Sequence, residues 1–324
     1  MKRTRTKHRT GAATPAERVP RLGRRTIRLS NPDKVLYPKV RFTKRDVVDY
    51  YIGVARYLLP HLKDRPVTLK RYPDGVNGHV FYEKDAPTFT PEWVKRFPVH
   101  RRGGGPDINY VVINDVATLA WCANLANLEI HPFLHRAPRT DVPTAVVFGL
   151  DPGEGMDVLR CGEVALLLRQ ALAGIDLEVF PKVSGSKGLQ LYVPLNTPVT
   201  YEQTQPFARV VAQTLERTYP RLVVAEMAKV RRVGRIFIDW SQNSDYKTTV
   251  AVYSLRATND QPFVSMPVRW QELERAVAAH NAAGLSFDPT GALRRLADIG
   301  DLFHPVLRLK QRLPVTAPPG RPPR

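Results

Sequence analysis

Carboxylates at the ends of two apolar segments are the residues whose type and spacing could do chemistry. Residues 144–148 predict a strand that leads into Gly149, with Asp151 two positions further on. Side chains alternate along a strand, so positions 149 and 151 share a face. A second apolar run ends at Asp239. Each aspartate alone could be a turn or cap residue. Two acids at strand ends together favour a divalent-metal site, and oxygen ligands without histidine suit Mg²⁺ or Mn²⁺.

Gly149 occupies the position where a second acid would complete a pair on the first strand. Two acids at 149 and 151 would make a paired-carboxylate metal site, and this chain presents only one of them. Whether the protein carries out metal-dependent chemistry therefore depends largely on this position.

A turn of small residues follows between two predicted strands, with the sequence VSGSKGLQLY over residues 183–192. It offers backbone N–H groups, the hydroxyl of Ser184 and the charge of Lys187, which together suit a triphosphate. The spacing of a Walker loop is absent, and a strand follows where that motif requires a helix. The turn alone is weak evidence, because ordinary hairpins also contain serine and glycine.

Basic and aromatic residues alternate on a hairpin predicted over residues 66–84. Lys70 and Lys84 flank Phe81 and Tyr82. This combination favours neutralisation of a nucleic-acid backbone together with base stacking, although an ordinary exposed strand is the alternative.

Two polar positions lie beside these segments. His131 ends an apolar stretch, where a lone histidine is more often structural than functional. Gln242 follows Asp239 in a polar strip that continues to Arg256.

The charge balance indicates a polyanionic partner. The 324 residues contain 49 lysines and arginines against 30 acids, for a net charge of +19. Residues 1–27 hold nine of these basic residues and one acid, Glu17. We expect this segment to be a disordered tail that either contacts nucleic acid or only aids solubility.

Cysteine content and hydropathy indicate the cellular compartment of the protein. Cys122 and Cys161 form no CxxC motif, which excludes a disulfide framework and a cysteine-rich zinc site. The sequence has neither a signal-peptide pattern nor an apolar run of about 18 residues. We expect a cytoplasmic protein without a membrane partner.

Periodicity predicts an α+β fold with a mixed or antiparallel sheet that supplies the functional face. Helices are predicted near residues 44–58, 116–127, 157–173, 201–217 and 270–283, and strands near 177–183, 189–194, 235–240 and 248–254. The predicted divisions are a basic tail over 1–27, a domain over 28–305 (an N-terminal part to about 140, a core over 141–270, then C-terminal helices) and a Pro-rich basic tail over 306–324.

Nine short strings occur in an order that resembles one family. They are NPDKVLYP, TK, KRYPDG, FYEK, LEIHP, LDPGEG, SGSKGL, FIDWSQN and KTTVAVYSLR, within residues 28–305. The chain resembles the polymerase domain of bacterial DNA ligase D, a member of the archaeo-eukaryotic primase superfamily. The resemblance implies a primase-polymerase-type core with a smaller N-terminal α/β subdomain, here as a stand-alone protein.

The resemblance also implies site residues and an activity. The family's metal ligands fall on positions 149, 151 and 239, and His131 joins Asp151 and Asp239 as catalytic. The positions implied to contact the nucleotide are Asn31, Lys70, His131, Ser184, Lys187, Arg232, Gln242 and Arg256; those implied to hold a 5′-phosphorylated end are Lys34, Lys44, Phe81 and Tyr82. The family adds ribo- or deoxyribonucleotides to such ends or gaps in non-homologous end joining. A Ku homologue and a separate DNA ligase are the implied partners, and the nucleoid is the implied location.

Two positions depart from the family pattern: Gly149 replaces an aspartate and Gln190 replaces a histidine. Two-metal phosphoryl transfer needs carboxylates to hold both ions, so the first loss should weaken catalysis. Gln190 can donate a hydrogen bond but carries no charge.

Three hypotheses about function remain open: a weakened repair polymerase, a catalytically silent end-binding or scaffolding protein on the same fold, and an unrelated basic nucleic-acid-binding protein.

Overall fold

The structure is a computed structural model that describes most of the chain. The described residues are 21–22, 25–101, 103–257 and 260–314. The tail predicted over 1–27 lies outside them except for 21–22 and 25–27, and the tail predicted over 306–324 lies outside them except for 306–314.

The N-terminal half is an antiparallel five-stranded sheet in the order β6-β5-β8-β7, with β9 also paired to β5. Thr43 caps helix α1 and forms a capping box with Asp46, as the polar residue before the apolar periodicity predicts. Its elements are β1 (Arg21–Leu22), β2 (Arg25–Thr26), β3 (Val35–Tyr37), β4 (Phe42–Thr43), α1 (Lys44–Leu62), β5 (Pro66–Arg71), β6 (Phe81–Glu83), β7 (Arg96–Val99), β8 (Ile108–Val112), α2 (Val116–Asn124) and β9 (Asn127–Pro132).

The C-terminal half is a mixed six-stranded sheet in the order β15-β16-β12-β14-β13-β19. Only the β15–β16 pair is parallel, and β12 lies between β16 and β14. The remaining elements are β10 (His135–Arg136), β11 (Arg139–Pro143), β12 (Ala145–Pro152), α3 (Val158–Ala173), β13 (Phe180–Val183), β14 (Leu189–Pro194), α4 (Tyr201–Thr218), β15 (Val223–Val224), β16 (Ile236–Asp239), β17 (Leu255–Arg256), β18 (Phe263–Val264), β19 (Met266–Pro267), α5 (Trp270–Ala278) and α6 (Pro289–Ile299).

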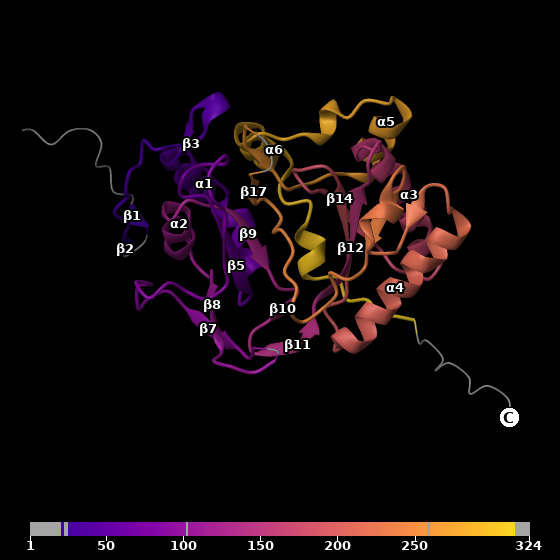
Figure 1. Cartoon of the computed structure of the whole chain (residues 1–324), viewed down its shortest axis with the longest axis horizontal. Helices are drawn as coiled ribbons and strands as arrows, with labels where there is room; N and C mark the ends of the chain where they lie inside the picture. The colour runs from indigo at the N-terminus through magenta and orange to yellow at the C-terminus, as the bar shows by residue number, and fades with distance from the viewer. Residues whose placement is uncertain (1–20, 23–24, 102, 258–259, 315–324) are drawn as a thin grey trace, which may run out of the picture.

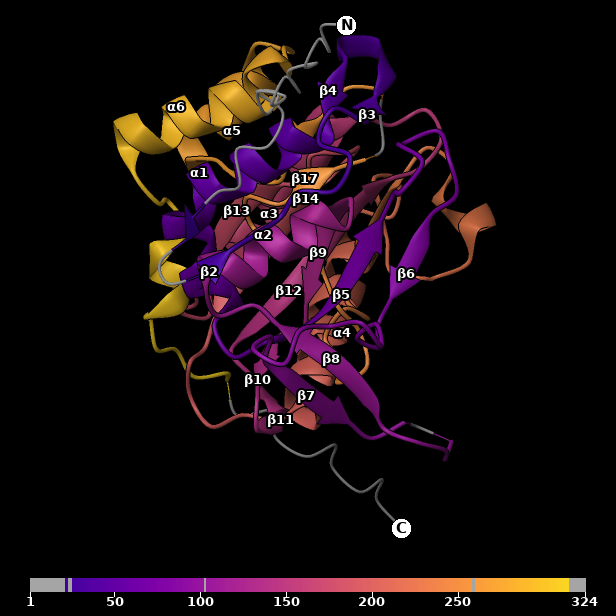
Figure 2. The ribbon, with the colours of Figure 1, turned by 90° about the vertical axis from the view of Figure 1, so that its left-hand side faces the viewer.

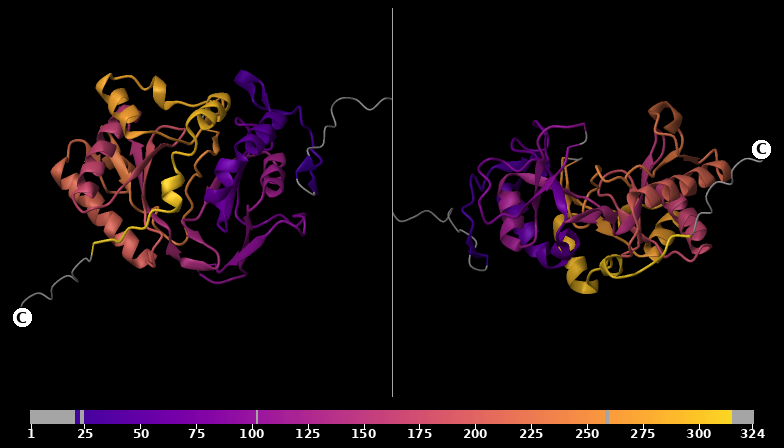
Figure 3. Two further views of the ribbon diagram at one scale, coloured as in Figure 1. Left: turned by 180° about the vertical axis from the view of Figure 1, so that it is seen from behind. Right: turned by 90° about the horizontal axis from the view of Figure 1, so that it is seen from below.

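The two sheets face one another with their helices on the outside. Helices α1 and α2 cover the outer side of the smaller sheet, and α3 and α4 cover that of the larger one (Figures 1 and 3). Strand β6 lies at the edge of the N-terminal sheet (Figure 2). One cluster of buried apolar residues runs through both halves, from Val47 on α1 to Leu296 on α6. The predicted α+β class is therefore correct.

The strand predicted over residues 248–254 is wrong. Thr248 makes an isolated bridge to Phe133, and Ala251 N–H donates to the carbonyl of Ile130. Tyr253 then has a φ of 63°, a left-handed conformation that no continuous strand accommodates. The segment is an extended connection along β9, and the strand β17 begins only at Leu255.

Candidate nucleotide and DNA-end site

Gly149 lies in the middle of a row of residues across the larger sheet. It faces Asp239 on β16 and Gln190 on β14, and Gln190 in turn faces Lys182 on β13. Residues directly opposite one another on neighbouring strands share a face. The two positions expected to depart from the family pattern are therefore direct neighbours. The prediction that positions 149 and 151 share a face is also confirmed, because β12 runs through both.

The backbone at Gly149 has room for a side chain. A Cβ atom there would lie 3.4 Å from the Cβ of Asp239, an ordinary van der Waals contact. Backbone sterics therefore do not require glycine at this position. The glycine leaves the row without the carboxylate that an aspartate at this position would add.

Asp239 and Asp151 remain as oxygen donors on this face. Asp239 is held by its neighbours: one oxygen accepts from Ser241 N–H (3.0 Å) and Oγ–H (2.5 Å), and the other accepts from Gln242 Nε2 (2.7 Å). Partial burial and, secondarily, the charge of Asp239 raise the pKa of Asp151. Two like charges that disfavour one another are a donor set that a hard divalent cation would stabilise, so these residues fit such an ion.

No third acid completes the set within the part of the chain that the structure describes, where no group of three or more His, Cys, Asp or Glu side chains could hold a metal ion. Asp157, which is near in sequence, is the N-cap of α3 and accepts from Arg160 N–H at 2.9 Å. Glu154 is exposed. Gly149 therefore leaves two carboxylates where three are implied.

Gln190 is hydrogen-bonded to a buried lysine. Its Oε1 accepts from Lys182 Nζ at 2.7 Å, and its Nε2 donates to Thr249 Oγ1 at 2.6 Å. Lys182 is fully buried and also donates to Ser265 Oγ (2.5 Å) and to the carbonyl of Val250 (3.2 Å). Burial lowers the pKa of Lys182 well below its ordinary value. The amide is thus an uncharged acceptor for the buried Nζ of Lys182.

The serine-glycine turn joins β13 to β14 at the same end of the sheet. Ser184 Oγ accepts from the N–H groups of Ser186 (3.2 Å) and Gly188 (3.3 Å). A Cβ on Gly188 would lie 2.0 Å from the carbonyl oxygen of Leu150, so only glycine lets the turn pass this close to β12. The turn holds the exposed Lys187 at the rim of a cavity.

One cavity of about 400 Å³ brings most of the expected nucleotide contacts together. It lies where β9 of the smaller sheet meets the turn and the row on the larger sheet. The predicted site residues that line it are His131, Asp151, Ser184, Lys187, Gln190, Gln242 and Arg256.

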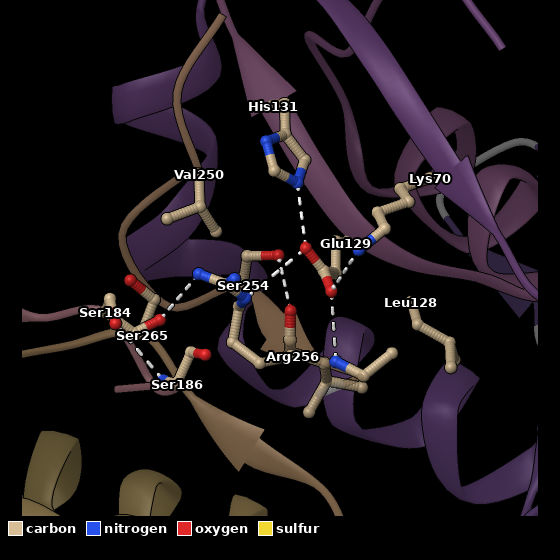
Figure 4. Close-up of polar contacts among 12 residues, drawn as sticks. Lys70, Leu128, Glu129, His131, Ser184, Ser186, Val250, Ser254, Arg256 and Ser265 are labelled. Carbon is tan, nitrogen blue, oxygen red and sulfur yellow. Dashed lines mark hydrogen bonds and ion pairs between the residues drawn. The ribbon is translucent and has the colours of Figure 1, made fainter. Parts of the chain in front are cut away.

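Glu129 is a member of this site that the sequence interpretation missed. It is fully buried on β9, where its Oε2 lies 2.9 Å from His131 Nε2 and 3.3 Å from Arg256 Nε (Figure 4). Its Oε1 accepts from Lys70 Nζ and from Ala257 N–H, both at 3.1 Å. The available signal was an acid between two buried apolar residues in the string LEIHP.

The charge of Glu129 is stabilised by its surroundings. Burial alone would raise the pKa of Glu129, but His131, Arg256 and Lys70 together hold it well below its usual range. Burial lowers the pKa of His131, and Glu129 opposes that shift. The group is therefore an anion surrounded by cationic and histidine side chains.

Arg256 contacts both Glu129 and the serine-glycine turn. Its Nη1 donates to the carbonyl of Ser184 at 2.8 Å, while its Nε faces Glu129. Gly185 in the turn would clash with Arg256 if it carried a Cβ, at 2.8 Å from Cγ. The arginine side chain therefore packs directly against the turn.

Arg232 does not line the cavity. Its guanidinium lies 3.7 Å from the centre of the Phe237 ring, and its Nη2 donates to the carbonyl of Met227 at 2.6 Å. Its charge nevertheless acts on Asp151, whose pKa it lowers against the larger effect of burial.

The residues expected at the DNA end form a second group on the N-terminal half. Lys44 is buried at the start of α1 and donates to the carbonyl (2.6 Å) and hydroxyl (3.2 Å) of Ser30. Burial and then the charge of Lys34 lower the pKa of Lys44, and the N–H of Lys44 donates to the carbonyl of Lys34 at 2.9 Å, so the two lysines are neighbours. Lys34 also pairs with Asp74 at 2.9 Å, and its N–H donates to the carbonyl of Asn31. Asn31 thus belongs with this group and does not line the cavity.

Phe81 and Tyr82 are exposed on β6, with 47% and 65% of their surfaces accessible. Lys70 Nζ lies 5.4 Å from the centre of the Tyr82 ring. Lys70 is therefore in contact with both the aromatic surface and Glu129, and so lies between the two groups.

The fold, the cavity and the basic aromatic edge together define a primase-polymerase-type domain. A family model described as LigD, primase-polymerase domain, matches residues 43–303, and the chain belongs to this family. The match confirms the predicted resemblance.

Relatives and a solved structure agree with this assignment. The chain is 43% identical over 282 residues to the multifunctional non-homologous end joining protein LigD of Mycolicibacterium smegmatis, covering 86% of this chain and 36% of that protein. It is 33% identical over 253 residues to the bifunctional LigD of Bacillus subtilis, covering 78% and 40%. The polymerase domain of Mycobacterium tuberculosis ligase D in complex with DNA matches with a TM-score of 0.80 and 42% identity, over 87% of this chain and 98% of that one. The chain thus spans about a third of the M. smegmatis protein.

Proposed function

We propose that this chain binds 5′-phosphorylated DNA ends or gaps together with a nucleoside triphosphate in end-joining repair, and that nucleotide addition is weakened or lost. The observation that carries the proposal is the row Asp239–Gly149–Gln190 beside a cavity that is lined by five of the eight expected nucleotide contacts. The binding groups are present and one carboxylate is missing.

Asp151 and Asp239 would hold Mg²⁺ or Mn²⁺ with the help of triphosphate oxygens. A bound dication would supply neutralisation of phosphate charge during transfer. Lys187, Arg256 and the N–H groups of the turn would bind the phosphates. We expect the ion that the triphosphate itself carries to be retained, because the nucleotide adds ligands to the two aspartates. Activation of a primer hydroxyl should suffer more, since it depends on protein carboxylates.

The second candidate function is a catalytically inactive end-binding or scaffolding protein. It is favoured by the pairing of the two departures: Gly149 and Gln190 face each other, so both changes fall at one point of the sheet. The groups expected at the DNA end lie on the other half of the fold, and the resemblance implies that they keep the residue types of the family.

The partners and location follow from the same proposal. DNA carrying a 5′-phosphate would be held between Lys34 and Lys44, with a base stacked on Phe81 or Tyr82. A Ku homologue and a separate DNA ligase are the proposed protein partners, and the nucleoid in the cytoplasm is the proposed location. Over the described residues, helices that combine the length and apolarity to cross a bilayer are absent.

A primer-extension assay with Mn²⁺ and ribonucleoside triphosphates, run beside binding to gapped DNA with and without a 5′-phosphate, tests the proposal. We expect preferential binding to the phosphorylated gap and weak or absent extension. Extension by the native chain as fast as by a relative with aspartate at position 149 would eliminate the inactive alternative. Equal binding to both gaps would contradict end recognition.

A further inference from the structure

Glu129 is the buried charge on which the cationic residues of the site converge. Its basic and histidine side-chain partners come from three strands: Lys70 from β5, His131 from β9 and Arg256 from β17. The hydroxyl of Tyr72 also donates to its Oε1 at 3.4 Å. The backbone N–H of Ala257 fills a further acceptor position at 3.1 Å. A buried carboxylate with this many donors fixes the positions of the groups around it. If one of these donors moved away, the buried charge would be left partly unpaired, which is costly.

The contact with His131 also fixes a tautomer. An ionised carboxylate only accepts hydrogen bonds, so Nε2 of His131, 2.9 Å from Glu129 Oε2, must carry a hydrogen. In the neutral ring the other nitrogen, Nδ1, is then an acceptor. Nδ1 lies on the far side of the ring from Glu129 (Figure 4), and His131 lines the cavity.

We propose that Glu129 is a positioning residue of the nucleotide site: it directs Nδ1 of His131 toward the bound nucleotide and holds Arg256 and Lys70 in the arrangement that binds it. This inference rests on the proposed function of the cavity. Glu129 itself touches no ligand in this scheme. It acts through His131, Arg256 and Lys70.

Glu129→Asp separates position from charge. The variant keeps the anion, so a role limited to electrostatic neutralisation predicts native affinity. Shortening the side chain by one methylene withdraws the carboxylate from partners at 2.9–3.3 Å. We expect the affinity for a fluorescent ribonucleoside triphosphate with Mn²⁺ to fall about tenfold, the loss of one charge-assisted hydrogen bond.

Glu272→Asp is the matched control. Glu272 on α5 is a half-buried carboxylate paired with Arg295 on α6, at 2.8 and 2.5 Å, and it does not line the cavity. This variant should lose a comparable ion pair and retain native nucleotide affinity. Native affinity in folded Glu129→Asp would overturn the inference.

A spectroscopic readout on the native chain keeps the inference testable if Glu129→Asp does not fold. In protein with ¹⁵N-labelled histidine, assigned with His131→Gln, we expect His131 to be the Nε2–H tautomer and its Nδ1 resonance to shift on nucleotide binding. An Nδ1–H tautomer in the native protein would also overturn the inference. If the native chain binds no nucleotide, the proposed function fails; nucleotide binding with an unchanged Glu129→Asp affinity removes the Glu129 role alone.

Discussion

Gly149 and Gln190 face each other across the antiparallel β12–β14 pair, and Asp239 faces Gly149 from the opposite side. One point of the sheet therefore contains both positions at which we expect a departure from the family pattern. A carboxylate at 149 would lie between the acid of Asp239 and the residue at 190. We therefore expect the identities of residues 149 and 190 to be energetically coupled.

Gly149→Asp combined with Gln190→His should create or raise nucleotide addition. The added Cβ would lie at an ordinary contact distance from Asp239, so the fold should accept the side chain. Three carboxylates offset the charge of two dications better than two, and we expect extension to rise about tenfold or more. Primer extension with Mn²⁺ measures this, with Gly149→Asn as the uncharged control of similar size. Equal activity in the native chain and the double variant would contradict the role given to Gly149.

The substitution Gly149→Asp alone should change the stability of the protein, which can be measured without any catalytic assay. Without metal, the introduced carboxylate would add a like charge near Asp151 and Asp239, which should lower the unfolding free energy by on the order of 1–3 kcal/mol. Mn²⁺ binds the folded state and should restore stability in Gly149→Asp more than in the native chain. Thermal unfolding in chelator and in Mn²⁺ measures the difference. A gain from Mn²⁺ no larger than that of Gly149→Asn would exclude a restored ligand.

Lys182 should depend on the amide of Gln190. Gln190→Leu removes the acceptor 2.7 Å from the fully buried Nζ of Lys182 and should cost about 1–3 kcal/mol of unfolding free energy. Lys182→Met combined with Gln190→Leu removes the buried donor as well and should be more stable than Gln190→Leu alone. Urea unfolding of both single variants and the double variant measures the coupling. Additive free-energy changes would contradict it.

The sequence predicts the local features of this site because they depend on neighbours along the chain. Strand alternation places positions 149 and 151 on one face, and Thr43 before an apolar periodicity predicts the start of α1. The serine-glycine turn is also a local feature.

Cross-strand partners could not be predicted in this way. The register that brings Gly149 opposite Gln190 and Asp239 depends on pairings between distant segments. Lys182 and Glu129 were missed for the same reason, since each is defined by contacts from several strands. The strand expected over 248–254 failed because tertiary bonds to β9 and the left-handed Tyr253 override its β-type composition.

Lys34→Ala should reduce the preference for a 5′-phosphate on gapped DNA. Lys34 is exposed and lies beside Lys44, so at the proposed end site its loss should remove one charged contact to the phosphate. We expect the ratio of affinities for phosphorylated and unphosphorylated gaps to fall roughly fivefold to tenfold. Lys39→Ala, at an exposed position about five residues away, is the control and should leave the ratio unchanged. An unchanged ratio in Lys34→Ala would remove this residue from the end site.

Acid should destabilise the fold through its buried histidines. Burial, and then the charge of Arg65, lowers the pKa of His135 to about 4, against about 6.5 in an unfolded chain. Between about pH 6.5 and pH 4 the unfolded state therefore binds a proton at this residue that the folded state does not bind. The free energy of unfolding falls as the pH drops through this window. Between about pH 7.5 and pH 5.0 the loss should be on the order of 2 kcal/mol. Urea unfolding at both values should show a smaller loss in His135→Gln and an unchanged one in the control His79→Gln, whose ring is exposed. The same pH dependence in His135→Gln as in the native chain would exclude His135 as its source.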